Sequence, residues 1–448
     1  MSDTGRRRQA VVTVNAPEHA VGPRVALVLP GGGARGAYEA GALSVLLPLL
    51  KQRGEEPAIL CGTSVGAINA ALLASLAHEP AEVQVAALVR RWTELERGKV
   101  VRRVIGPASV RSLAKGALGL AGLPNGRPIG LLDPTPLKDS LEDWIDWERI
   151  HRNVLAGHVD ALCTVATSLE RGGAVAFVHA KRPLPPARPG EDLAFESVRT
   201  NVDHVRASAA IPFVFPPVLV KDPKRVAGYY IDGGTRLNSP LKPALALGAT
   251  RVVVIGFAPF GPAPAKPGGV SRRPSLADVI SNVLDGLLFD QVGADLHRVA
   301  AVNAHFVEGG LAGASRAYRA GSQSQPYRRI SYALVAPQSR SEVAEIAERV
   351  IRARMRGLGP LRDPEQAVMS RLLGMGGRGA ELLSLLLFDG EFARELIEAG
   401  RRDAQRWIDR HPGLWCADGR HDFDLLPGDP EREREVTAVE EWRQLRRR

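Results

Sequence analysis

The sequence contains few cysteines and no long apolar run. Its 448 residues include only three cysteines, Cys61, Cys163 and Cys416, and they form no CxxC pair. This excludes a disulfide framework and a cysteine-ligated zinc site, and it favours a reducing compartment. Because no window of 18 consecutive apolar residues occurs, no transmembrane helix is expected. Arg6, Arg7 and Arg8 are not followed by an apolar segment, so no secretory signal is expected either.

Aromatic residues make up only 5% of the chain, which argues against a protein that stacks single-stranded nucleic acid. The 59 basic residues against 49 acidic residues give a net charge of +10. Such a surplus suits an anionic lipid surface or an acidic metabolite, although an arginine bias of the genome would produce it as well. We therefore expect a cytoplasmic protein, free or peripherally bound to a membrane, with no nucleic-acid partner. The sequence makes no prediction of the number of subunits.

The apolar pattern predicts an α/β fold with a mainly parallel sheet. Residues 24–30 form a short apolar run before glycines, and residues 36–50 have helical length. Residues 58–63 form a second apolar run, followed by an Ala/Leu-rich helix over 65–77. Strand, glycine turn and helix, repeated, are typical of parallel sheets. Further strands are expected at 160–167, 174–179, 229–232, 251–258 and 329–335.

The remaining segments divide the chain into three parts. Residues 1–23 predict a flexible tail, residues 24–340 the main domain, and residues 341–448 a helical extension without strands. Within the main domain, residues 84–155 are expected to be mainly helical, and residues 277–302 have helical spacing. Pro-rich stretches predict loops at 181–190 and 259–274. Residues 431–448 are a mixed-charge run typical of a solvated helix.

The first glycine-rich motif is Gly31-Gly32-Gly33-Ala34-Arg35-Gly36, which lies between the first expected strand and helix. It matches the GxGxxG pattern of dinucleotide-binding proteins. Glycines also let a backbone approach a ligand closely, and N–H groups at a helix start attract negative charge. The motif alone therefore allows either a pyrophosphate or a transient oxyanion.

The second motif, Gly62-Thr63-Ser64-Val65-Gly66, favours the oxyanion. It is a GxSxG at the end of an apolar strand and the start of an Ala-rich helix, the setting of a nucleophile elbow. Gly62 and Gly66 relieve crowding in the tight turn, and Ser64 becomes the candidate nucleophile.

A serine nucleophile needs a base, and histidine is the usual one. None of the ten histidines lies in a glycine-flanked loop at a strand end, although chain order still permits a Ser-His-Asp triad. Asp232, followed by Gly233 and Gly234, does lie at a strand end. Carboxylates there project into the crevice of an α/β sheet, so a Ser64–Asp232 dyad is the hypothesis. Because an ordinary Asp is a weak base, Asp232 is expected to be partly buried with a raised pKa.

Taken together, GGGARG, GTSVG and DGG in this order resemble the patatin-like phospholipases. Residues 207–216 (ASAAIPFVFP) are similar to the block between elbow and aspartate in that family, and Asn238-Ser239-Pro240 resembles its Asn-x-Pro. The resemblance covers residues 24–250 well and the rest weakly.

The resemblance implies a three-layer α/β/α fold and lipid acyl hydrolysis without a cofactor or metal. Ser64 would be the nucleophile and Asp232 the base. The Gly31, Gly32 and Gly33 backbone would form the oxyanion hole, with Arg35 supporting that loop or meeting a lipid phosphate. Gly36, Gly62, Gly66, Gly233 and Gly234 would then support the motifs. A transacylase, an esterase for another lipid or polyester, and a non-catalytic lipid-binding protein remain alternatives.

Residues 109–123 are the candidate for lipid access, and two further apolar segments are expected to pack against the protein. Residues 109–123 are either a lid or interfacial helix or a helix packed on the sheet. Residues 382–388 (LLSLLLF) are too short to span a bilayer and are expected to pack onto the catalytic domain, over the site. Residues 144–147 (WIDW) are expected to be a packing face.

Overall fold

The computed structural model describes most of the chain outside its two ends. The described residues are 23–100, 133–186, 192–212, 214–259, 292–293, 295–296, 298–300, 303, 329–339, 341–355 and 378–416. The expectations for residues 1–22, 109–123 and 431–448, for nearly all of 259–274 and for most of 277–302 fall outside this part.

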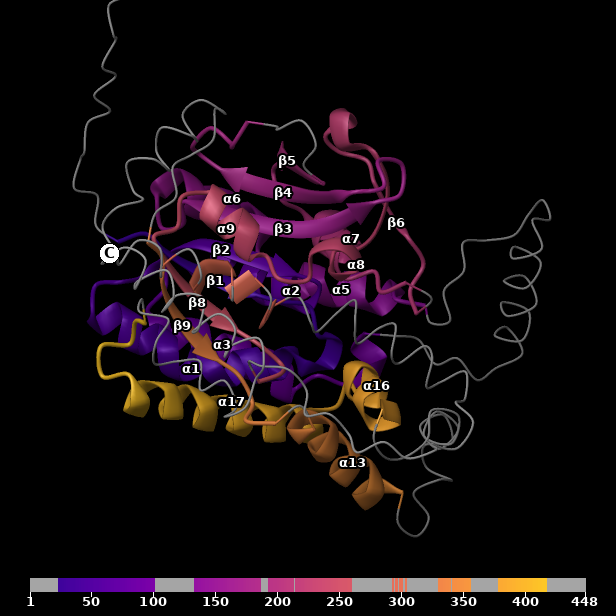
Figure 1. Cartoon of the computed structure of the whole chain (residues 1–448). Coiled ribbons are helices and arrows are strands. Elements are labelled where there is room, and N and C mark those ends of the chain that lie inside the picture. Colours follow the sequence, from indigo (N-terminus) through magenta and orange to yellow (C-terminus); the bar gives the residue numbers. More distant parts are fainter. Residues whose placement is uncertain are drawn as a thin grey trace, which may run out of the picture.

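A mixed, mostly parallel sheet forms the centre of the molecule (Figure 1). The strand order is β5-β4-β3-β2-β1-β8-β9, and β3, β2, β1, β8 and β9 all run in parallel. At one edge β4 is antiparallel to β3, and β7 with its partner β6 pairs antiparallel with the end of β3. The strands are β1 Val25–Leu29, β2 Pro57–Thr63, β3 Ala161–Ser168, β4 Ala174–Ala180, β5 Leu193–Ser197, β6 Val218–Val220, β7 Gly228–Asp232, β8 Arg251–Ile255 and β9 Ser331–Val335.

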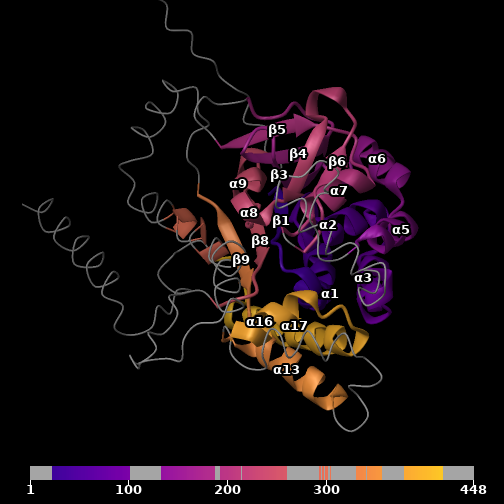
Figure 2. The ribbon, with the colours of Figure 1, turned by 90° about the vertical axis from the view of Figure 1, so that its right-hand side faces the viewer.

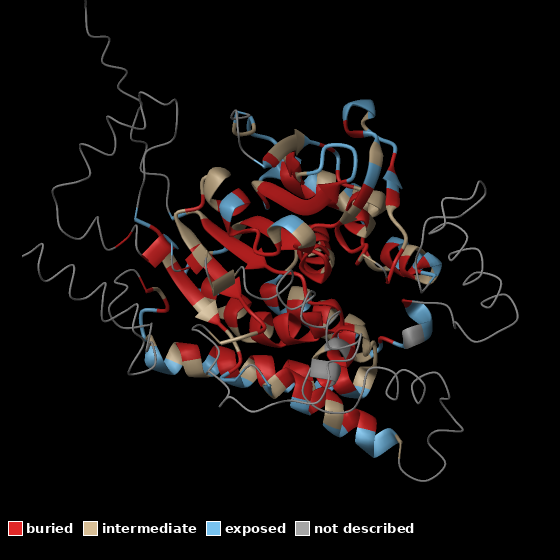
Figure 3. Ribbon diagram, turned by 45° about the vertical axis from the view of Figure 1, so that its right-hand side comes forward, coloured by how far each residue is buried: buried red, intermediate tan, exposed pale blue. Residues whose placement is uncertain are grey.

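Helices cover both faces of this sheet, which confirms the expected fold class. Figure 2 shows α8 and α9 on the opposite side of the sheet from α2, α3 and α6. The helices of the first half are α1 Gly36–Gln52, α2 Val65–Leu76, α3 Ala81–Thr93, α5 Thr135–Trp144, α6 Trp147–Ala156, α7 Val202–Ser208, α8 Gly234–Leu237 and α9 Leu241–Ala246. All five residues of β1 are buried, as a central strand with both faces covered requires (Figure 3).

The C-terminal helices belong to the same hydrophobic core as the sheet. They are α13 Glu342–Arg354, α16 Arg378–Leu386 and α17 Gly390–Arg410, and α17 packs along α1. A methyl group on Gly400 would overlap the Tyr38 carbonyl oxygen, and one on Gly41 would overlap the Ile397 carbonyl oxygen. Small residues therefore permit this close crossing. The buried Tyr38 hydroxyl donates to Asp403 Oδ2 at 2.7 Å across it.

Some elements differ from the sequence expectations. The strands β5 and β6 and the short helix α7 were not expected, because each is too short to show a clear apolar period. The strand expected over 251–258 ends at Ile255. In the extension, Cys416 pairs with Tyr332 of β9 through an isolated antiparallel bridge. The boundary at residue 340 stays a prediction. Among the described helices, none is long and apolar enough to cross a membrane.

Candidate active site

Ser64 lies in a strained turn between β2 and α2. Its backbone has φ 52° and ψ −124°, a conformation that L-residues rarely adopt. The turn is possible because Gly62 and Gly66 pack against backbone: a methyl group on Gly66 would overlap the Leu29 carbonyl oxygen, and one on Gly62 the Gly66 carbonyl oxygen. The turn lifts Ser64 to the start of α2, where the first N–H groups have no carbonyl of their own helix to bind.

The Ser64 hydroxyl donates a hydrogen bond to the Asp232 carboxylate. The distance from Ser64 Oγ to Asp232 Oδ2 is 2.6 Å, and both residues are buried. Asp232 ends β7, which runs antiparallel to the end of β3, so the sheet itself places the carboxylate beside the elbow. The second carboxylate oxygen, Oδ1, accepts the Gly234 N–H at 2.7 Å, and this bond holds the carboxylate in its orientation.

The environment of Asp232 makes it a better base than an ordinary aspartate. Complete burial raises its pKa from 3.8 to about 7, although the hydrogen bonds from Ser64 and the Gly234 N–H act in the opposite direction. A carboxyl group whose pKa lies near neutral pH combines basicity with a useful ionised fraction.

The glycine loop of residues 31–33 faces the elbow from the end of β1. The Gly31 N–H is occupied, because it donates to Asn238 Oδ1 at 2.9 Å. The Asn238 side chain also donates to the Gly31 carbonyl at 3.3 Å. This bidentate clamp was not expected from the sequence, which singled out Asn238 without giving it a role. It leaves Gly32 and Gly33 as the oxyanion candidates of the three expected glycines.

Ser208 is a supporting residue that the sequence reasoning did not identify. Its hydroxyl accepts the Ser64 N–H at 2.9 Å and donates to the Val165 carbonyl at 2.5 Å. In addition, the Ser208 carbonyl accepts the Gly233 N–H at 3.3 Å. Ser208 thus ties the elbow, β3 and the Asp-Gly-Gly turn together. The only signal in the sequence was its place in the block of residues 207–216.

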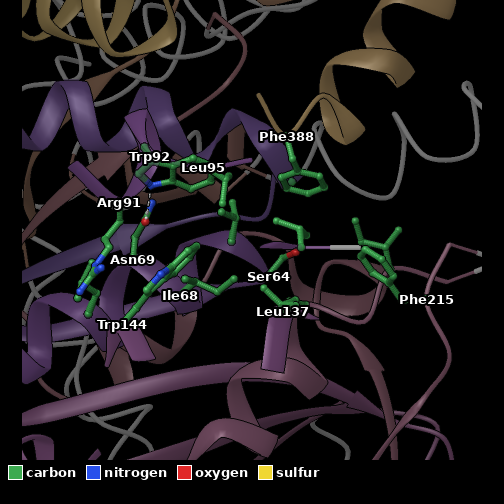
Figure 4. Close-up of a pocket in the computed structure, with 16 residues that line it drawn as sticks. Ser64, Ile68, Asn69, Arg91, Trp92, Leu95, Leu137, Trp144, Phe215 and Phe388 are labelled. Atoms are coloured by element: carbon green, nitrogen blue, oxygen red, sulfur yellow. Dashed lines mark hydrogen bonds between the residues drawn. The ribbon is translucent and has the colours of Figure 1, made fainter. Parts of the chain in front are cut away.

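A narrow cavity of about 50 Å³ opens from Ser64 (Figure 4). Its walls come from α2, α3, α5 and the segment after α7, and they are mostly apolar. Ile68 and Leu72 lie on α2, Leu137 and Trp144 on α5, and Ile211 and Phe215 follow α7. Phe388, between α16 and α17, completes the wall. Such a lining suits an acyl chain next to the candidate nucleophile.

A comparison with family models places this site in context. Residues 27–245, which include the elbow, the glycine loop and the Asp-Gly-Gly turn, match the model of the patatin-like phospholipases. This region is a patatin-like phospholipase domain. Lipid acyl hydrolysis is the general activity that this domain match supports.

Other comparisons add little to the patatin assignment. The crystal structure of VipD from Legionella pneumophila is similar over 87% of this chain and 67% of that one, with 13% identity. The TM-score of this match is 0.29. No curated protein sequence matches the chain.

Arg35 of the patatin glycine loop binds the C-terminal region. Its buried guanidinium donates from Nε to Ser384 Oγ at 2.8 Å and from a terminal nitrogen to the Glu381 carbonyl at 2.9 Å. Its own N–H donates to the Gly32 carbonyl. Beside it, a methyl group on Gly33 would overlap the Leu385 carbonyl oxygen. Arg35 therefore supports the loop by fixing α16 against it, and the expectation that residues 382–388 pack over the site agrees with this placement.

The histidine alternative gains no support from the described residues. His204 is buried in α7, where it forms a capping box with Asn201, and burial lowers its pKa to about 4. The Nε2 atom of His179 in β4 lies 3.1 Å from Nδ1 of His151 in α6, so these two rings contact each other. The Ser64 hydroxyl donates to a carboxylate instead. Within the described ranges no cluster of His, Cys, Asp and Glu could hold a metal ion.

Asn238→Ala is expected to lower kcat about 10- to 100-fold, because the freed Gly31 peptide no longer holds the patatin loop in place. Asn303→Ala is a matched control. The Asn303 amide clamps the Ile330 backbone with bonds of 2.7 and 2.9 Å, as Asn238 clamps Gly31. Steady-state ester hydrolysis, with unfolding curves for both variants, checks the prediction. Equal activity losses in the two variants would show a general effect of stability.

Proposed function

We propose that this protein is a serine acyl hydrolase for lipids, of the phospholipase or lysophospholipase type, that uses a Ser64–Asp232 dyad. The 2.6 Å hydrogen bond from the strained Ser64 to the buried Asp232 carries the proposal. The intact pair favours an enzyme over a non-catalytic lipid-binding protein of the same fold. The apolar cavity beside Ser64 favours a fatty acyl group over a small acid.

In the first half of the reaction, Ser64 Oγ attacks the ester carbonyl while its proton moves to Asp232. Negative charge develops on the carbonyl oxygen, and the N–H groups of Gly32 and Gly33 with the start of α2 stabilise it. One such donor is typically worth about 2.7–4 kcal/mol. As the tetrahedral intermediate collapses, the C–O bond to the alcohol breaks, and Asp232 returns the proton to the departing alkoxide.

In the second half, a water molecule attacks the acyl-enzyme and gives its proton to Asp232. The second tetrahedral intermediate collapses, the fatty acid leaves, and the proton returns to Ser64 Oγ. An acceptor alcohol in place of water would give acyl transfer between lipids by the same steps. The cavity of about 50 Å³ is smaller than the ~150 Å³ that holds a benzene ring, so binding a long chain requires its walls to move apart.

Active-site labelling tests the proposal directly. A serine-directed fluorophosphonate is expected to label the wild-type protein once, at the peptide that contains Ser64. The Ser64→Ala variant should remain unlabelled and should release no fatty acid from mixed membrane lipids, whereas the wild type should. A folded wild-type protein that neither reacts with the probe nor releases any fatty acid would contradict the proposal.

The pH dependence of turnover is expected to follow Asp232. Because the ionised carboxylate is the base, kcat/KM should rise with pH, pass its half-maximal value near pH 7 and then level off. Below that value the rate should fall about tenfold per pH unit. A pH–rate profile on a neutral ester checks this. A half-maximal pH near 4, the ordinary value for aspartate, would show that burial does not tune the base.

A further inference from the structure

Among the described residues, one cation lines the mostly apolar cavity that holds Ser64. Arg91, in the last turn of α3, is the single charged side chain among the described residues that line it. Figure 4 shows Ser64 beside Phe215 and Phe388, and Arg91 with Trp144 at the far end beyond Ile68. The nucleophile and the cation therefore occupy opposite ends of one cavity.

Arg91 has no anionic partner among the described residues. Its Nε is buried and without a hydrogen-bond partner, and no salt bridge within the described ranges includes this guanidinium. A buried donor without an acceptor costs about 1–3 kcal/mol, and more when the group is charged. Arg91 as a whole is half-buried, so this cost applies to its Nε.

The polar side chains that line the cavity beside Arg91 bind other partners. Asn69, which also lines the cavity, accepts the Trp92 indole N–H at 3.0 Å and donates to Glu39 at 2.7 Å. Burial raises the pKa of Glu39 well above its ordinary value, which favours the neutral acid. Ser64, another polar side chain that lines the cavity, donates its hydrogen bond to Asp232.

We propose that Arg91 selects substrates that carry an anionic group, which it binds at the far end of the cavity while the ester lies at Ser64. This rests on the proposed function and adds a substrate class to it. A guanidinium binds phosphate or carboxylate with two parallel hydrogen bonds, so a single anionic group satisfies the donors that the protein leaves unpaired.

The length of the cavity agrees with such a substrate, although its walls must move apart to admit the chain. Its lining follows α2 from Ser64 through Ile68 to Leu72, which is two helical turns or about 12 Å at 1.5 Å per residue. A spacer of several atoms, either part of an acyl chain or the glycerol of a head group, fits between the ester and the anion. The anion is either the phosphate of a lipid head group or a carboxylate on the acyl chain, and both present the same paired oxygens to Arg91.

Matched substrates test the proposal. The p-nitrophenyl ester of octanoate is compared with the p-nitrophenyl half-ester of octanedioate, which adds a terminal carboxylate. Palmitoyl lysophosphatidic acid is compared with palmitoyl glycerol, which lacks the phosphate. In Arg91→Met, kcat/KM is expected to fall about 10- to 100-fold for one of the two anionic substrates. It should change less than threefold for both neutral esters. The pair that shows the loss identifies the source of the anion.

Arg90→Met is the control, because Arg90 precedes Arg91 on α3 and is exposed. It removes the same charge from the protein without changing the cavity, so it should leave all four rates unchanged. Arg91→Lys should recover part of the anion preference, since it keeps the charge but loses the paired geometry. Equal effects of Arg91→Met on neutral and anionic esters, or no effect on either anionic ester, would overturn the proposal.

A binding measurement separates this proposal from the proposed function. Octyl phosphate and octanedioate are not cleaved, and calorimetry on the wild-type protein should detect binding of one of them. Arg91→Met should weaken that binding at least tenfold. Binding that depends on Arg91 in a protein without esterase activity would refute the hydrolase alone. Hydrolysis of esters with no binding of either anion would refute the role of Arg91 alone.

Discussion

Asp232→Asn is expected to remove ester hydrolysis almost completely and, at the same time, to stabilise the folded protein. The amide cannot accept the Ser64 proton, and loss of a general base typically costs 10²- to 10⁴-fold in rate. Asparagine keeps the shape of the carboxyl group, so the oxygen that accepts the Gly234 N–H can be retained. What disappears is the cost of an ionised carboxylate that is completely buried.

The sign of the stability change follows from the two pKa values. Asp232 has a pKa of about 7 in the folded protein and an ordinary value of 3.8. Its protonated form therefore favours folding at low pH, and this contribution is lost as the pH rises from about 4 to about 7. Above pH 7 the full difference, about 4 kcal/mol, is a cost that the amide avoids. Asp232→Asn should thus be more stable than the wild type at pH 8 and nearly equal to it at pH 4.

Denaturant unfolding at these two pH values, with ester turnover at pH 8, checks both parts. Asp160→Asn is a control with the opposite sign, since Asp160 accepts two hydrogen bonds from Arg24 at 2.7 and 3.0 Å. That variant should lose stability at pH 8 and keep its activity. An active Asp232→Asn protein would refute the dyad. An inactive one that is less stable than the wild type at pH 8 would refute the buried-charge explanation.

Gly400→Ala should destabilise the protein by about 3 kcal/mol, although residue 400 lies far along the chain from Ser64 and Asp232. The added methyl group would overlap the Tyr38 carbonyl oxygen, and neither backbone can yield without separating α17 from α1. Overpacking of this kind costs typically 1–3 kcal/mol, and a clash with backbone on both sides lies at the upper end. Separation would also break the buried Tyr38–Asp403 hydrogen bond.

The midpoint of denaturant unfolding measures this effect. Gly413→Ala is the control, since no atom lies within 4 Å of the position of its added methyl group. It should change the unfolding free energy by less than about 0.5 kcal/mol. A Gly400→Ala variant as stable as Gly413→Ala would mean that α17 is not part of the cooperative core.

The parts of the site that the sequence predicts are those built from local patterns. Ser64 stands out because the apolar strand, the flanking glycines and the following helix lie within about twenty residues. The Asp232 turn is visible for the same reason. The pairing of the two follows from a sheet topology that the short motifs imply only in combination.

The supporting residues could not be found this way, because their roles depend on contacts between distant segments. Asn238 clamps Gly31 from 207 positions away, and Ser208 binds the Ser64 N–H from 144 positions away. Arg91 is an unremarkable residue of an amphipathic helix until the cavity is known. Phe388 reaches the same cavity from a segment that the family match does not include. Polar residues with such roles have no periodicity and no local motif.

The position of α17 in the chain has a consequence for synthesis of the protein. The ribosome completes Ser64, Asp232 and all the described strands of the sheet before it makes residues 390–410. During that interval the face of α1 around Tyr38 and Gly41, which α17 covers in the folded chain, has no partner. A nascent chain that stops short of α17 therefore exposes apolar surface and is a natural substrate for chaperones. The core shared by the sheet and α17 is therefore completed only when residues 390–410 have been made.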